Sequence, residues 1–143
     1  MRYDKMLTLT LAQIRFCAEE VEKQQDGPLA VYDMCNAFGY VLSLHGAVLA
    51  PYGICGIAQI VVPSNKGFRQ IPVTFDNRLG GVAPENIERQ LEFLCKADIT
   101  PEEFYQRFEE IHPFEDGNGR VGAILYNFHR GLMDAPVAPP MFE

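Results

Sequence analysis

The sequence lacks the features that mark several large functional classes. It has 12 Lys and Arg against 19 Asp and Glu, which gives a net charge of −7, and the basic residues do not cluster. Proteins that bind nucleic acids neutralise phosphates with clustered basic side chains, so we expect no nucleic-acid partner. No apolar run approaches the roughly 18 residues of a membrane-spanning helix, so we expect no membrane partner either. Internal repeats and low-complexity tracts are absent as well.

The four cysteines lack the spacing of a metal site or a redox pair. Cys17, Cys35, Cys55 and Cys95 form no C-x-x-C pair and have no histidines at zinc-ligand intervals. We therefore expect reduced thiols that pack in the interior. The N-terminal apolar run is short and interrupted by polar residues, unlike a secretory leader, so we expect a cytoplasmic protein. A chain of 143 residues is long enough for one core, and we expect a single domain over residues 1–143.

Hydrophobic periodicity predicts a mainly helical domain. Apolar residues recur at helical spacing in several segments, and Thr100, Pro101 and Glu103 together are typical of a capped helix start. The predicted helices cover about residues 7–21, 29–45, 84–94, 100–111 and 120–132.

Residues 47–75 carry a different pattern. The stretch from 47 to 63 is broken by Pro51, Gly53 and Gly56, and we predict buried loop and strand there. Bulky and polar residues alternate over 67–75, after a turn at 64–67. We therefore predict a β-hairpin inserted between the helices, over about residues 57–75.

The residues best suited to binding and catalysis lie in the segment that joins the last two predicted helices. The segment from His112 to Arg120 reads HPFEDGNGR. Gly117 and Gly119 let successive N–H groups turn in one direction, and the N-terminus of the next helix adds its positive dipole, which favours a bound anion. Arg120 opposes that dipole unless an anion lies between the two. The sequence therefore predicts a phosphate-binding loop.

Two further side chains complete a site for transfer at phosphorus. Asp116 offers the carboxylate oxygen with which proteins hold a Mg²⁺ ion that also binds substrate phosphates. His112 can accept a proton near neutral pH. We predict His112 as the general base, Asp116 as the metal ligand, and phosphate binding by Gly117, Asn118, Gly119 and Arg120.

This segment resembles the signature of the Fic family, H-x-F-x-[D/E]-G-N-G-R followed, after two intervening residues, by a second Arg. Every position matches as far as Arg120, and weaker similarity extends over about residues 29–132. The resemblance implies a compact all-α Fic-like domain of a minimal Fic/Doc type, with an inserted β-hairpin flap and a motif loop at 112–120. It also implies that Phe114 anchors the loop in the core.

The same resemblance implies an activity. Family members typically transfer a nucleoside monophosphate, most often AMP from ATP, to a Ser, Thr or Tyr hydroxyl of a target protein. The implied cofactor is Mg²⁺, and the implied donor is ATP or another nucleotide. The flap would align the target as an added strand, with Lys66, Gly67, Phe68 and Arg69 as flap and target-binding residues.

The family's second arginine is replaced by Ala123. In the family this residue meets the terminal phosphate and is captured by an inhibitory glutamate, and a single charge-assisted contact of this kind contributes about 1.5–3 kcal/mol. Two alternatives therefore stay open: a degenerate Fic domain that binds a nucleotide or a protein, and a Fic enzyme that transfers phosphocholine or phosphate. The phosphate-transferring toxin branch characteristically carries Lys where this chain has Gly119. The inhibitory pattern [S/T]-x-x-x-E-[G/N] is missing, and an external antitoxin partner stays open.

Overall fold

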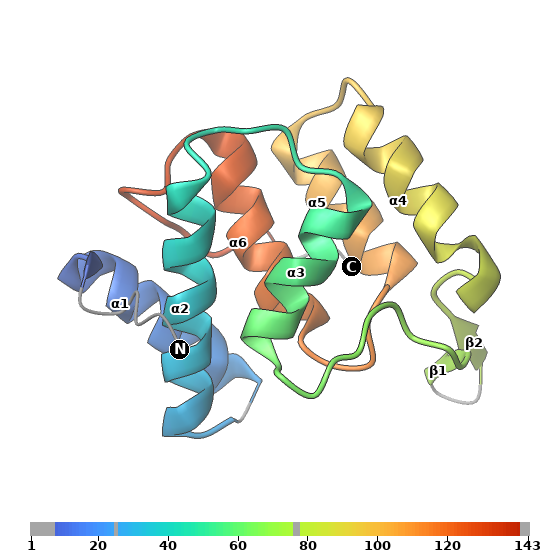
Figure 1. Cartoon of the computed structure of the whole chain (residues 1–143), viewed down its shortest axis with the longest axis horizontal. Coiled ribbons are helices and arrows are strands. Elements are labelled where there is room, and N and C mark those ends of the chain that lie inside the picture. The colour runs from blue at the N-terminus through green and yellow to red at the C-terminus, as the bar shows by residue number, and fades with distance from the viewer. Residues whose placement is uncertain (1–7, 25, 76–77, 141–143) are drawn as a thin grey trace.

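A computed structural model describes residues 8–24, 26–75 and 78–140 and shows an all-helical domain with one short strand pair (Figure 1). This confirms the predicted helical class. The elements in this part of the chain are α1 (Leu11–Lys23), α2 (Pro28–Ser43), α3 (Pro51–Val61), β1 (Val73–Phe75), β2 (Arg78–Gly80), the 3-10 helix η2 (Pro84–Asn86), α4 (Ile87–Lys96), α5 (Pro101–Ile111) and α6 (Asn118–Arg130).

Local sequence signals set most helix starts. Thr10 accepts a hydrogen bond from the Gln13 N–H in a capping box at α1, and Thr100 does the same for the Glu103 N–H at α5. Proline opens α2, α3 and α5, at positions where its missing N–H costs no helical hydrogen bond. These signals act within one turn, so they are visible in the sequence.

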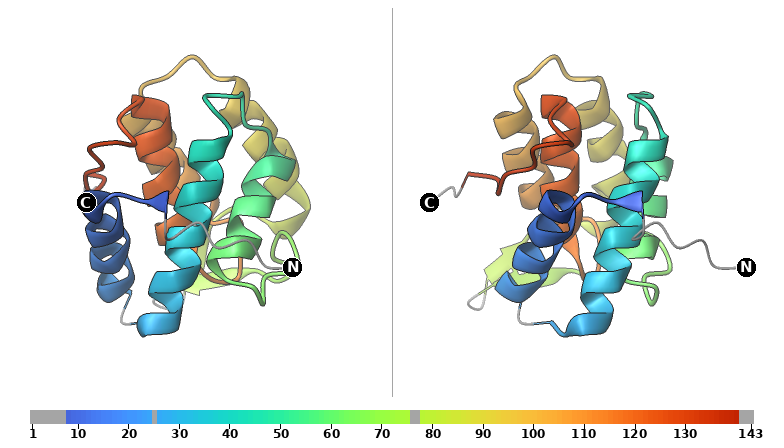
Figure 2. Two further views of the ribbon diagram at one scale, coloured as in Figure 1. Left: turned by 60° about the vertical axis from the view of Figure 1, so that its left-hand side comes forward. Right: turned by 90° about the vertical axis from the view of Figure 1, so that its left-hand side faces the viewer.

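Helix α6 lies at the centre of the fold. It packs against α5, α3, α2 and α1, while α1 and α4 lie at opposite ends of the helical array (Figures 1 and 2). Every residue from Arg120 to Asn127 is buried, so α6 has apolar neighbours on all sides. The motif loop that precedes α6 is therefore attached to the most constrained helix of the domain.

The predicted hairpin over residues 57–75 is not seen. Residues 57–61 form the end of α3, because Ile54, Ile57, Ala58 and Val61 form a buried stripe at helical spacing. β-branched residues and glycines concealed this period, and buried strands and buried helices are hard to distinguish over short apolar runs. A shorter antiparallel pair lies further along the chain, with Val73 opposite Gly80 and Phe75 opposite Arg78.

The cysteines follow the expectation of reduced thiols. Cys17 and Cys35 are buried, Cys55 and Cys95 are half-buried, and none of the four forms a disulfide. Within the described residues, no group of three or more His, Cys, Asp or Glu side chains could hold a metal ion. None of the helices described has the length and apolar character that would let it cross a membrane.

Two phenylalanines test how strongly the α5 packing stabilises the domain. Phe108 on α5 is fully buried, whereas Phe93 on α4 is 75% exposed. We expect Phe108→Ala to lower the free energy of unfolding by about 3–5 kcal/mol, because the side chain leaves a cavity. Phe93→Ala removes the same atoms from the surface and should change the free energy of unfolding by less than about 0.5 kcal/mol. Urea unfolding measures both; equal losses would contradict this packing.

Candidate functional site: the loop between α5 and α6

The loop begins and ends on residues in the left-handed backbone region. His112 follows α5 with φ 50° and ψ 63°, and Gly117 precedes α6 with φ 82° and ψ 8°. A Cβ at Gly117 would lie 2.9 Å from Cγ2 of Val62. Glycine is therefore required at Gly117 by backbone strain and by lack of space. The two turns bring the end of α5 and the start of α6 close together.

Two side chains fix the loop between these ends. Phe114 is fully buried, as the family resemblance implies, and its ring stacks on Phe68 with 5.8 Å between centroids. Asn118 accepts a hydrogen bond from the Phe114 N–H at 2.9 Å and donates one to the Phe114 carbonyl at 2.8 Å. The Asn118 amide thus closes the loop, and what it offers to a phosphate is its backbone N–H at the start of α6.

Asn65 and Arg69 hold the loop from outside the motif. The Asn65 amide donates to the carbonyls of Ala58 and Asp116, both at 3.1 Å, and so joins α3 to the loop. The role of Asn65 is not visible in the sequence, because this residue lies in a predicted turn and only its tertiary contacts give it a role.

Arg69 is 2% exposed, and its guanidinium donates hydrogen bonds to four backbone carbonyls. These acceptors belong to Ile71, Val82, Ile111 and His112, and the Arg69 N–H also donates to the Pro113 carbonyl at 2.9 Å. The carbonyls of the last turn of α5 have no helical donors, and Arg69 satisfies two carbonyls at the end of this helix.

The predicted flap residues differ in exposure and packing. Lys66 is exposed and Gly67 has φ 139°. Phe68 packs on the motif loop and Arg69 lies beneath it. Of the four residues, Lys66 is the one whose side chain projects into solvent.

His112 is half-buried at the end of α5. Burial lowers the pKa of its imidazole below the ordinary value of 6.5, and the positive charge of Arg69 lowers it further. Lowering the pKa keeps the imidazole neutral at pH 7, the form that can accept a proton. The environment of His112 is therefore suited to a general base.

Opposite charges gather at the start of α6. Arg120 is 3% exposed, and its Nη2 lies 3.4 Å from Oδ1 of Asp116 and 3.2 Å from Oδ2 of Asp26. Asp116 Oδ1 also accepts the Gly117 N–H at 2.8 Å. The Asp116 side chain is 67% exposed, so its carboxylate faces solvent beside the anion site. Loop 112–120 thus brings together a neutral imidazole, an accessible carboxylate and a buried guanidinium.

The donor set is compatible with Mg²⁺ held partly by substrate. Asp116 Oδ1 accepts hydrogen bonds from the Gly117 N–H and from Arg120, and Oδ2 can serve as a ligand to a metal ion. A cation at this position would have one protein carboxylate and would take its other ligands from phosphates and water, as Mg²⁺ commonly does.

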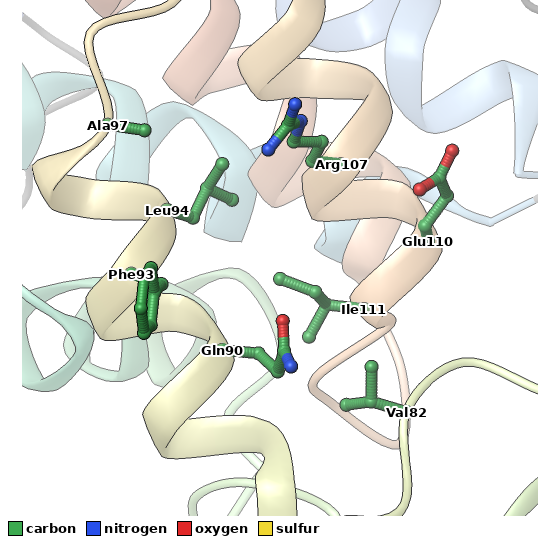
Figure 3. A pocket seen from close by; sticks show the side chains of 8 residues that line it. All are labelled: Val82, Gln90, Phe93, Leu94, Ala97, Arg107, Glu110 and Ile111. Carbon is green, nitrogen blue, oxygen red and sulfur yellow. The ribbon is translucent and has the colours of Figure 1, made fainter.

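A groove lies beside the loop, between α4 and α5 (Figure 3). Its volume is about 600 Å³, and Val82 and Ile111, the residue that precedes His112, are among the residues that line it. The Val82 N–H donates to the Ile111 carbonyl at 3.3 Å, which ties the end of the strand pair to α5. The groove and the motif loop therefore share the C-terminal end of α5.

Replacement of Arg69 tests its role as support for the loop. A lysine cannot reach several carbonyls in different directions, so we expect Arg69→Lys to lower the free energy of unfolding by about 2–4 kcal/mol. Arg89 is exposed and donates a hydrogen bond to Asn86 on the surface. Arg89→Lys should therefore change the free energy of unfolding by less than about 0.5 kcal/mol. Thermal and urea unfolding give both values. Equal stability of the two variants would contradict the supporting role.

Comparisons with known proteins agree with this geometry. The family model of the Fic/DOC family matches residues 39–129. A Fic domain containing signaling protein from Bacteroides thetaiotaomicron is 22% identical with a TM-score of 0.55, covering 74% of this chain and 51% of that chain. A second solved structure, IbpAFic2 covalently tethered to Cdc42, is 22% identical with a TM-score of 0.67. The match covers 94% of this chain and 52% of that chain.

No curated protein matches this sequence. The chain spans about half the length of the two solved structures. At this identity those structures show a shared fold, while the family model covers more than half of the sequence and includes the whole motif loop. The chain therefore belongs to the Fic/DOC family.

Proposed function

We propose that this chain is a Fic-type transferase that moves a nucleoside monophosphate from a nucleotide to a Ser, Thr or Tyr hydroxyl of a target protein. The observation that carries the proposal is the presence of three groups on the one loop that joins α5 to α6. His112 supplies a neutral imidazole, Asp116 an accessible carboxylate, and Arg120 a buried positive charge at the N-terminus of α6. A base, a metal ligand and a positive charge for the phosphates are the groups that transfer at phosphorus uses, and their presence on one loop supports the proposal.

The proposed reaction is a single displacement at the α-phosphorus of the donor. The target hydroxyl oxygen forms a bond to phosphorus while the bond to the leaving pyrophosphate breaks. His112 accepts the proton of the hydroxyl as the new bond forms. The pyrophosphate carries away the electron pair of the broken bond, next to the N–H groups of Gly119 and Arg120 and the Arg120 side chain.

Mg²⁺ is the cofactor that fits this site. Asp116 would hold the ion, and when bound it would offset the negative charge of the donor phosphates. The protein's own part is to present the Asp116 carboxylate beside Arg120, on a loop that Phe114 and Asn118 keep in place.

Ala123 stands where the family motif has its second arginine, so the motif segment lacks one positive charge that could bind a longer phosphate chain. It is fully buried within α6. Arg120 is therefore the arginine that the motif segment provides for phosphate, and it lies between two carboxylates. We expect the donor to be held mainly through the phosphates nearest the α6 N-terminus.

Label transfer tests the proposed activity. Wild type and His112→Ala are incubated with each of the four α-labelled nucleoside triphosphates, Mg²⁺ and a bacterial lysate. We expect a labelled protein band with wild type and a loss of at least about 100-fold in His112→Ala, because general-base catalysis contributes about 10²–10⁴-fold. A band of equal intensity in His112→Ala would remove His112 from the base role. Absence of any band would redirect the proposal to another donor or to a binding module.

The pH dependence of transfer tests the state of His112. Its pKa lies below 6.5, so the imidazole loses its ability to accept a proton only when the pH falls below that value. We expect the transfer rate to be constant near neutral pH and to fall on the acid side with a midpoint below 6.5. Rates measured from pH 5 to 8 at saturating donor check this. A midpoint above 6.5 would contradict a neutral base in this environment.

A further inference from the structure

Two residues from the connection between α1 and α2 lie against the first turn of α6. Asp26 places Oδ2 3.2 Å from Nη2 of Arg120. Gln24, which ends α1, lies beside Gly119, where an added Cβ would be 3.2 Å from the Gln24 amide nitrogen. The first N–H groups of α6 have no intrahelical acceptor and form an anion site. The α1–α2 connection therefore borders the site where the donor phosphates are proposed to bind.

The Arg120 guanidinium requires an anion in this position. It is 3% exposed, and its Nε is buried without a hydrogen-bond partner. A buried charge is costly unless a counter-charge lies beside it. Asp26 supplies one, and Asp116 contributes a second, longer contact at 3.4 Å.

The two partners of this ion pair differ in their freedom to move. The Asp26 side chain is 42% exposed, whereas that of Arg120 is 4% exposed. Asp26 can turn into water and remain solvated, while Arg120 stays in the protein and keeps only the longer contact with Asp116 as its counter-charge. The Asp26 carboxylate is therefore the partner that can leave the ion pair, and an incoming phosphate would take its place beside Arg120.

We propose that Asp26 is a specificity-determining residue of the donor site. Its carboxylate neutralises Arg120 when no donor is bound, and a phosphate of the donor displaces it. The inference rests on the proposed function, because it takes the N-terminus of α6 as the donor site. A carboxylate carries one negative charge, and a pyrophosphate group carries more charge and more acceptor oxygens. Asp26 therefore selects for highly charged phosphates and excludes singly charged anions.

A supporting role for Asp26 would have the opposite effect on binding. If Asp26 only held Arg120 in position, its removal would misplace the guanidinium and weaken phosphate binding. If Asp26 competes with phosphate, its removal strengthens binding. The sign of the change in affinity therefore separates the two roles.

The experiment measures the affinity of the protein for inorganic pyrophosphate by titration calorimetry. We expect Asp26→Asn to bind pyrophosphate roughly three- to tenfold more tightly than wild type, since a partly exposed ion pair contributes little more than this. Glu22→Gln is the matched control, because it removes the same charge from an exposed position on α1 and should leave the affinity unchanged. Added acetate should weaken pyrophosphate binding more in Asp26→Asn than in wild type.

Arg120→Gln separates failure of this inference from failure of the proposed function. Pyrophosphate binding that depends on Arg120 but is unchanged or weaker in Asp26→Asn overturns the role of Asp26 alone. Asp26→Ala serves as a second Asp26 variant, and thermal unfolding verifies that each variant is folded. Pyrophosphate binding that is insensitive to Arg120→Gln overturns the donor site and the inference together. Absence of binding in wild type, Asp26→Asn and Asp26→Ala does the same.

Discussion

The hydrogen bonds from Arg69 to backbone carbonyls connect the parts of the molecule on which the site depends. Its guanidinium reaches the last carbonyl of α5, the carbonyl of His112 and the carbonyl of Val82, while its own N–H donates to Pro113. One buried cation thus fixes the end of α5, the start of the motif loop and the segment that follows the strand pair. Its charge also lowers the pKa of His112. Support of the loop and adjustment of the proposed base come from the same side chain.

The charges at the start of α6 form a second, more adjustable arrangement. Arg120 is buried, whereas the side chains of its carboxylate partners Asp26 and Asp116 are 42% and 67% exposed. The buried partner is the one that would bind phosphate, and the accessible partners are those that would exchange contacts with donor and metal. This division agrees with a site whose backbone is held by Asn118 and Phe114 and whose anions are replaceable.

Most of the fold and the position of the site could be predicted from the sequence, but the predicted hairpin was wrong. Helix starts at Thr100 and Pro101 depend on contacts within one turn, so local sequence sets them. The segment that became α3 has an apolar stripe, but its β-branched residues and glycines also suit a strand. Packing against α2 and α6 decides in favour of the helix, and such contacts are not local.

The sequence by itself determined the family motif, the helical class and the residues with which a phosphate, a metal ion and a proton could interact. These follow from residue type and short spacing. Only the tertiary structure decided that Arg69 lies beneath the loop, that the Asn118 amide closes it, and that Asp26 shares Arg120. The physical reason is that a buried polar group must find its partner wherever the fold brings one, and those partners lie 2 to 94 residues away along the chain.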